Sequence, residues 1–165
     1  MSKDIWISDI LAGKYDGSEV ELKGWIYRSR GSNKIRFIVV RDSTGNIQCV
    51  AKRDVLGDVF FDELKSSLIE SSVILKGLVQ PTDREHGHEL QVSSGEVVGS
   101  VNPERPFPIT ESAMAEADGG ETEFLLDNRH LYLRTSRMTT MLKIRSSVFG
   151  AVHSYFRDLD FIEYQ

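Results

Sequence analysis

The sequence predicts a mainly β fold: a small five-stranded barrel with a helix between its third and fourth strands, followed by a connector and a long amphipathic helix. Segments with alternating apolar residues occur three times before a stretch of helical spacing and twice after it. Polar turns separate these short segments. Closing such a sheet removes most of its exposed edge hydrogen bonds, which favours a barrel over an open sheet.

The first three strands are predicted within residues 20–51. Apolar residues recur at every second position over residues 20–27 and again over 35–40, with a loop at Gly31-Ser32-Asn33 between the two strands. The third strand covers residues 47–51 and follows a turn rich in Asp, Ser, Asn and Gly. A single helical turn over residues 8–12 precedes all three.

The apolar spacing changes between Asp54 and Glu70 to a period near 3.6, which predicts a helix. Strands are predicted again over residues 73–80 and 89–98. This order of three strands, one helix and two strands is that of the OB-fold. An SH3-like barrel would not readily explain a helix at that position.

Beyond Gly99 the composition changes, and three of the four prolines lie in the next ten residues. We interpret residues 1–99 as the barrel, 100–134 as a linker and hinge, and 135–165 as the start of another domain. Apolar residues recur on one helical face over residues 136–159, and this face is longer than is needed to cover a small barrel. Because residues 161–165 look like the start of a strand, we expect the chain to be part of a longer protein.

Composition excludes several classes of protein. With 40 % hydrophobic and 27 % charged residues, the chain is not disordered over its whole length. The net charge of −5 excludes a protein that binds polyanions through overall charge. One cysteine, Cys49, allows no internal disulfide, and no apolar run reaches the roughly 20 residues of a membrane span. The start resembles no secretory or transit peptide, so we expect a cytoplasmic location.

Charge is unevenly distributed along the chain. Residues 19–53 hold eight basic and three acidic side chains, whereas residues 83–130 hold eleven acidic and three basic ones. Trp25, Tyr27 and Phe37 lie among the basic residues, and cations with aromatic rings are what single-stranded nucleic acid binds. The alternative is a solvated basic face followed by an acidic linker.

Several motifs in this order resemble the anticodon-binding barrel of the class IIb aminoacyl-tRNA synthetases, which serve aspartate, asparagine and lysine. The matching residues are 24–26, Arg28, Arg30, 37–42, Gly45 and 47–50, and downstream segments 127–131, 144–146 and 161–163 are similar to the hinge and first class II motif. Within the family, residues 41–50 and 89–92 most resemble the asparagine-specific members of archaeal and eukaryotic type. Tyr164 departs from the valine that many members have there.

The resemblance implies an anticodon site of five residues. Phe37 would stack on the central uridine, and Gln48 would read that base with one acceptor and one donor. Arg28 and Arg30 would meet the RNA backbone and bases, and Glu89 would accept from the first base. A core role for Phe37 and a solvated role for the polar side chains are the alternatives. The loop 81–88 is where we expect the third base to be read.

For a whole enzyme the resemblance implies a homodimer that uses ATP and Mg²⁺ to attach asparagine to tRNA. The second and third class II motifs do not occur in this sequence, so we expect the chain to bind tRNA, to hold no cofactor and to catalyse nothing. His86-Gly87-His88 makes a poor metal site because no further ligands lie nearby. An aspartate-specific relative and a free-standing OB-fold protein that coats single strands are the alternatives.

Overall fold

The computed structural model describes residues 5–83, 87–109 and 122–164. The chain divides into two compact units, residues 1–107 and residues 108–165, and each is described by itself. The predicted boundaries at residues 99 and 134 remain predictions.

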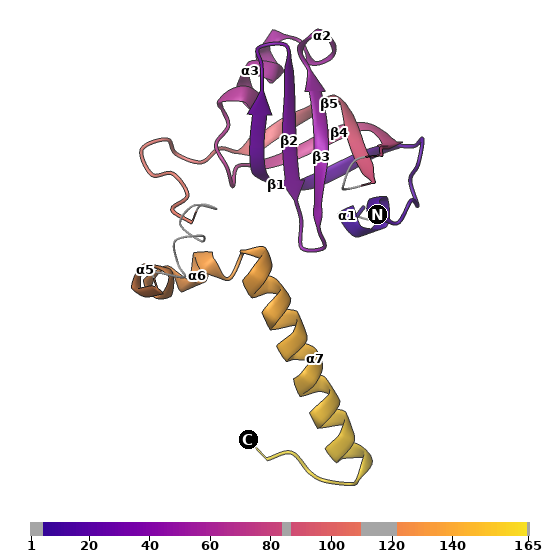
Figure 1. Ribbon diagram of the computed structural model, residues 1–165, viewed down its shortest axis with the longest axis vertical. Coiled ribbons are helices and arrows are strands. Elements are labelled where there is room, and N and C mark those ends of the chain that lie inside the picture. Colours follow the sequence, from indigo (N-terminus) through magenta and orange to yellow (C-terminus); the bar gives the residue numbers. More distant parts are fainter. Residues whose placement is uncertain (1–4, 84–86, 110–121, 165) are drawn as a thin grey trace. The chain divides into compact units, whose positions relative to one another are not determined.

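The first unit is a closed barrel of five strands, drawn in Figure 1. The strands lie in the order β1-β2-β3-β5-β4, and all neighbours are antiparallel except β3 and β5, which are parallel. This architecture confirms the predicted five-stranded barrel. The strand bounds are β1 Glu19–Gly31, β2 Ile35–Arg41, β3 Asn46–Lys52, β4 Ser72–Pro81 and β5 His88–Gly99.

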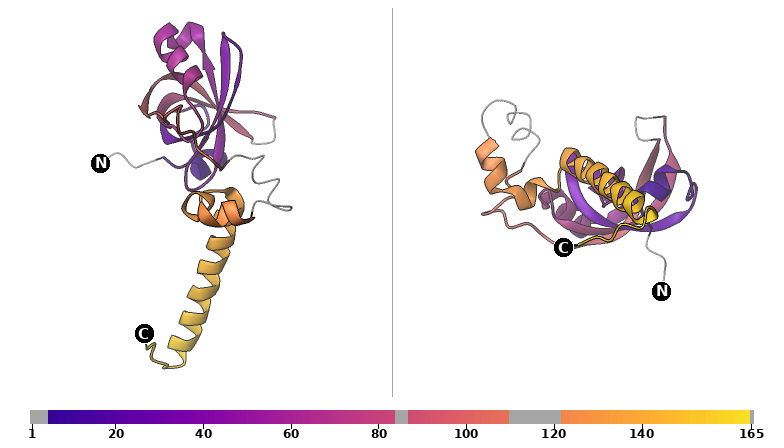
Figure 2. Two further views of the ribbon diagram at one scale, coloured as in Figure 1. Left: turned by 90° about the vertical axis from the view of Figure 1, so that its left-hand side faces the viewer. Right: turned by 90° about the horizontal axis from the view of Figure 1, so that it is seen from below.

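Helices close both ends of the barrel. Between β3 and β4 lie α2 (Arg53–Leu56) and α3 (Asp58–Ser66), so the prediction of a helix at this place is confirmed. It is divided because Gly57 has φ +74°, a conformation that interrupts a helix. At the opposite end lies α1 (Ile7–Leu11), as Figures 1 and 2 show. The Asp42 carboxylate accepts a hydrogen bond from the Ile7 N–H at 2.8 Å and fixes the start of α1.

The core draws on every strand: buried and exposed positions alternate in most of β1 and β4, whereas residues 47–51 of β3 are all buried. Cys49 belongs to it as expected, is fully buried and carries a free thiol. Burial raises the pKa of this thiol because the charged thiolate cannot be solvated there. Fully buried members from the strands include Leu22, Ile26, Ile38, Val40, Ile47, Leu75 and Leu90.

The second unit is helical. Its longest element is α7 (Ser136–Asp158), which confirms the predicted long helix. Two short helices, α5 (Thr122–Asp127) and α6 (Arg129–Tyr132), occupy part of the predicted hinge, while residues 110–121 of the predicted connector lie outside the described residues. The strand expected near the end of the chain is not formed over residues 161–164. No helix among the described residues is long and apolar enough to cross a membrane.

Candidate nucleic-acid interface

Strand register brings all five predicted site residues to one face of the barrel. Residues paired across a sheet point to the same side, and the outward positions form two neighbouring rows across β1, β2, β3 and β5. We call these eight positions the two-row face. The first row is Arg28, Val39, Gln48 and Glu89, and the second is Arg30, Phe37, Val50 and Gln91.

A bulge in β1 is what turns the two arginines outward. Leu22 and Ile26 point into the core, so strict alternation would also point Arg28 and Arg30 inward. The pairing with β2 shifts between Ile26 and Arg28, after which Arg28 lies opposite Val39 and Arg30 opposite Phe37. One extra residue in a strand moves every later side chain of that strand to the opposite side of the sheet. Both arginine side chains are consequently exposed.

Phe37 lies on the outer surface of β2. Its neighbours Ile38 and Val40 are fully buried, whereas Phe37 is half-buried and outside the core cluster. The Arg30 guanidinium carbon is over the Phe37 ring, 5.7 Å from the ring centroid. A cation held over a half-exposed ring is an arrangement on which a nucleobase can stack.

Gln48, Glu89 and Gln91 form a hydrogen-bonded chain. The Gln48 amide donates from Nε2 to Oε2 of Glu89 at 3.2 Å, and the Gln91 amide donates from Nε2 to Oε1 at 2.7 Å. Gln48 is only 9 % exposed, so it is not the freely solvated polar residue of the alternative interpretation. Gln91 is not among the five site residues that the family resemblance implies. Its position two residues after Glu89 on an alternating strand is the signal that could have identified it.

Two basic residues of the segment 19–53, Arg41 and Arg53, form ion pairs with acidic residues of the protein. Arg41 donates through Nη2 to both oxygens of Glu70, at 2.7 and 2.9 Å, and the two side chains are 12 % and 7 % exposed. Arg53 pairs with Asp58 and Asp62. The charge count of the segment therefore overstates the positive charge available to a ligand.

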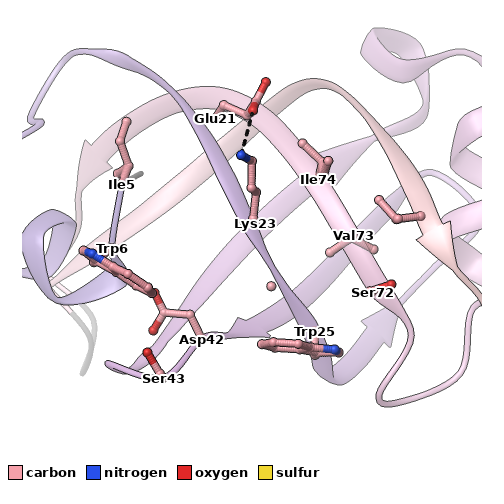
Figure 3. Close-up of a pocket in the computed structure, with 12 residues that line it drawn as sticks. Ile5, Trp6, Glu21, Lys23, Trp25, Asp42, Ser43, Ser72, Val73 and Ile74 are labelled. Carbon is pink, nitrogen blue, oxygen red and sulfur yellow. Dashed lines mark ion pairs between the residues drawn. The ribbon is translucent and has the colours of Figure 1, made fainter. Parts of the chain in front are cut away.

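One pocket of about 720 Å³ lies on another part of the barrel surface, along β1 and β4. Figure 3 shows Trp6 and Trp25 among the residues that line it, together with an ion pair between Lys23 and Glu21. None of the residues of the two-row face lines this pocket. This pocket is therefore separate from the two-row face.

The loop expected to read the third base is described only in part. Thr82 donates its N–H to the Gly87 carbonyl at 2.9 Å, and residues 84–86, including His86, lie outside the described residues. His88 pairs through Nε2 with Asp16 at 2.8 Å. Among the residues that the structure describes, no group of three or more His, Cys, Asp or Glu side chains could hold a metal ion.

Comparison with known proteins identifies the family to which this barrel belongs. Residues 20–98 match the family model of the tRNA anti-codon OB-fold nucleic acid binding domain. The chain is 40 % identical over 160 residues to an asparagine–tRNA ligase of Thermoplasma acidophilum, covering 96 % of this chain and 35 % of that protein. The chain thus spans about a third of the length of the curated relatives it matches.

Solved structures give the same result. The crystal structure of asparaginyl-tRNA synthetase from Pyrococcus horikoshii superposes with a TM-score of 0.84 at 30 % identity, covering 100 % of this chain and 38 % of that one. An aspartyl-tRNA synthetase from Entamoeba histolytica, at 18 % identity, shares the fold with a TM-score of 0.80 and covers 99 % of this chain and 39 % of its own. Residues 20–98 are therefore an OB-fold domain of the tRNA anticodon-binding family, in a chain related to asparagine–tRNA ligases.

Proposed function

We propose that the two-row face binds the anticodon of an asparagine tRNA. The observation that carries this proposal is the register, which brings Phe37, Gln48 and Glu89 from three strands to adjacent outward positions. Phe37 stacks on the central uridine. Gln48 offers a carbonyl oxygen to the uracil N3–H and an N–H to O4, whereas cytosine presents the reverse pattern.

The remaining residues contact the first base and the backbone. Two carboxylate oxygens of Glu89 match the N1–H and N2–H₂ donors of guanine. Arg28 and Arg30 are exposed beside these positions, and a guanidinium binds a phosphate with two parallel hydrogen bonds or lies flat against a base. An ordered row of donors and acceptors favours recognition of particular bases over the coating of any single strand.

The whole protein, in this proposal, is a cytoplasmic, homodimeric ligase that uses ATP and Mg²⁺ to attach asparagine to its tRNA. This rests on similarity to relatives about three times as long as the chain. The chain spans about a third of these relatives and contains the anticodon-binding OB-fold match at residues 20–98, so in this proposal it supplies the RNA-binding part of that ligase.

The test is a binding titration of the 165-residue chain against an asparagine anticodon stem-loop. Phe37→Ala should weaken binding by about 1–3 kcal/mol, roughly 5- to 150-fold, with little change in the unfolding midpoint. Trp25→Ala, which removes an exposed aromatic side chain from the pocket surface, is the matched control and should leave the affinity unchanged.

The same titration separates the alternatives. Changing the central uridine to cytosine should weaken binding to the wild-type chain, whereas a coating protein would bind both loops equally. Asparagine and aspartate anticodons differ at the third base, so a preference for the aspartate loop would assign the chain to an aspartate-specific enzyme. Phe37→Ala binding as tightly as wild type would refute the proposed site.

A further inference from the structure

The Glu89 carboxylate lies between two glutamine amides on the outer face of the barrel. Gln48 of β3 donates to one carboxylate oxygen at 3.2 Å, and Gln91 of β5 donates to the other at 2.7 Å. The pairing of Gln48 with Glu89 on parallel strands brings the first two together, and Gln91 faces the same way because it is two residues farther along β5.

This arrangement determines which way the Gln48 amide is turned. An ionised carboxylate only accepts hydrogen bonds, so Gln48 must direct its NH₂ group, and not its carbonyl oxygen, toward Glu89. The reversed amide would place two oxygens against each other. At 9 % exposure, Gln48 also has little free space in which to adopt another rotamer.

We propose that Glu89 and Gln91 are positioning residues for Gln48, and that they set its preference for uridine at the centre of the anticodon. With one N–H held by Glu89, Gln48 presents its carbonyl oxygen and its second N–H to the base. Uracil matches this pair through N3–H and O4, and cytosine does not. The inference rests on the proposed function, and it adds Gln91 to the site.

A second consequence is that recognition of the first and central bases is coupled. The same carboxylate that accepts from the first base also orients the residue that reads the central base. A carboxylate has about four lone-pair positions, so it can hold both amides and still accept from guanine. Gln91 occupies Oε1 and thereby prevents the carboxylate from rotating away from Gln48.

The experiment measures the ratio of affinities for two asparagine anticodon stem-loops, one with uridine and one with cytosine at the centre. Glu89→Gln and Gln91→Leu keep the approximate side-chain volume and remove, respectively, the acceptor-only group and the donor that holds it. Each should lower the uridine preference roughly three- to tenfold. The matched control is Gln80→Leu: Gln80 lies opposite Glu89 on β4, is exposed, and should leave the ratio unchanged.

The outcomes separate this inference from the proposed function. A purely structural role for Gln91 would lower the unfolding midpoint and leave the ratio unchanged, so an unchanged ratio in both variants overturns the inference. If the wild-type chain itself does not distinguish the two loops, the proposed function fails instead. If Gln91→Leu does not fold, the isosteric Glu89→Gln decides the result alone.

Discussion

The two units of the chain bury their apolar side chains to very different extents. In the barrel, side chains from all five strands form a common core, and Ile38, Leu75 and Leu90 are fully buried. In α7, no residue is buried, and the larger apolar side chains other than Met138 are between 40 % and 63 % exposed. Burial of apolar side chains therefore stabilises the barrel. By contrast, α7 is stabilised mainly by interactions within the helix itself.

The largest test of this difference is a core truncation. Ile38→Ala should lower the free energy of unfolding of the barrel by about 2–5 kcal/mol, because it removes a fully buried side chain and leaves a cavity. Urea unfolding followed by tryptophan fluorescence reports on the barrel alone, since both tryptophans, Trp6 and Trp25, lie in it. Val148→Ala, at an exposed position of α7, is the control and should leave this transition unchanged; a loss as large as that of Ile38→Ala would show that the barrel depends on α7.

Replacing a glycine with alanine should change stability in opposite directions in the two units. A Cβ on Gly77 of β4 would lie 2.1 Å from the Gln91 carbonyl oxygen, so Gly77→Ala forces β5 to move and should cost the barrel about 1–3 kcal/mol. Gly150 of α7 has open space around the corresponding position, and alanine is the better helix former by about 1 kcal/mol. Fluorescence-detected unfolding checks the first variant and the helical circular dichroism signal the second. If Gly77→Ala and Gly150→Ala changed stability in the same direction and by the same amount, this difference between the two units would be contradicted.

Much of this fold follows from local pattern. The five strands and the long helix were predictable because apolar residues recur with a period near two in most of the strands and near 3.6 in α7. The division of the helix at Gly57 was missed, since a glycine with positive φ is not distinguishable in sequence from one that merely tolerates a helix.

The site was less predictable from pattern than the fold. Periodicity alone points Arg28 inward, and only the bulge after Ile26, a property of strand pairing, turns it outward. The resemblance to a family supplied Arg28 and Arg30, where alternation would have failed. Alternation along the strand places Gln91 on the same face as Glu89, but its hydrogen bond to Glu89 depends on side-chain conformation, which no sequence motif specifies.

A smaller effect should appear at the start of α7. The Thr135 hydroxyl accepts a hydrogen bond from the Met138 N–H at 3.4 Å, and Thr135 is 6 % exposed. Thr135→Ala should cost the helix about 1 kcal/mol, seen as a lower helical signal on heating, because an unpaired N–H is left at the helix start. Thr140→Ala, at an exposed position inside α7, is the control. A simultaneous fall in the fluorescence midpoint would show that the barrel relies on this helix.

The smallest expected effect concerns an exposed ion pair of the barrel. Hydrogen bonding to Arg53 lowers the pKa of Asp62, so the folded state favours the carboxylate. The resulting stabilisation is present above the unfolded pKa of about 4 and is lost as the pH falls through the lower folded value. Asp62→Asn should therefore lower the unfolding midpoint slightly at pH 7 and not at about pH 2, and salt should reduce the difference. Asp54→Asn makes the same charge change in α2 without removing a bond to Arg53, so a pH-dependent loss in that variant as well would assign the effect to net charge.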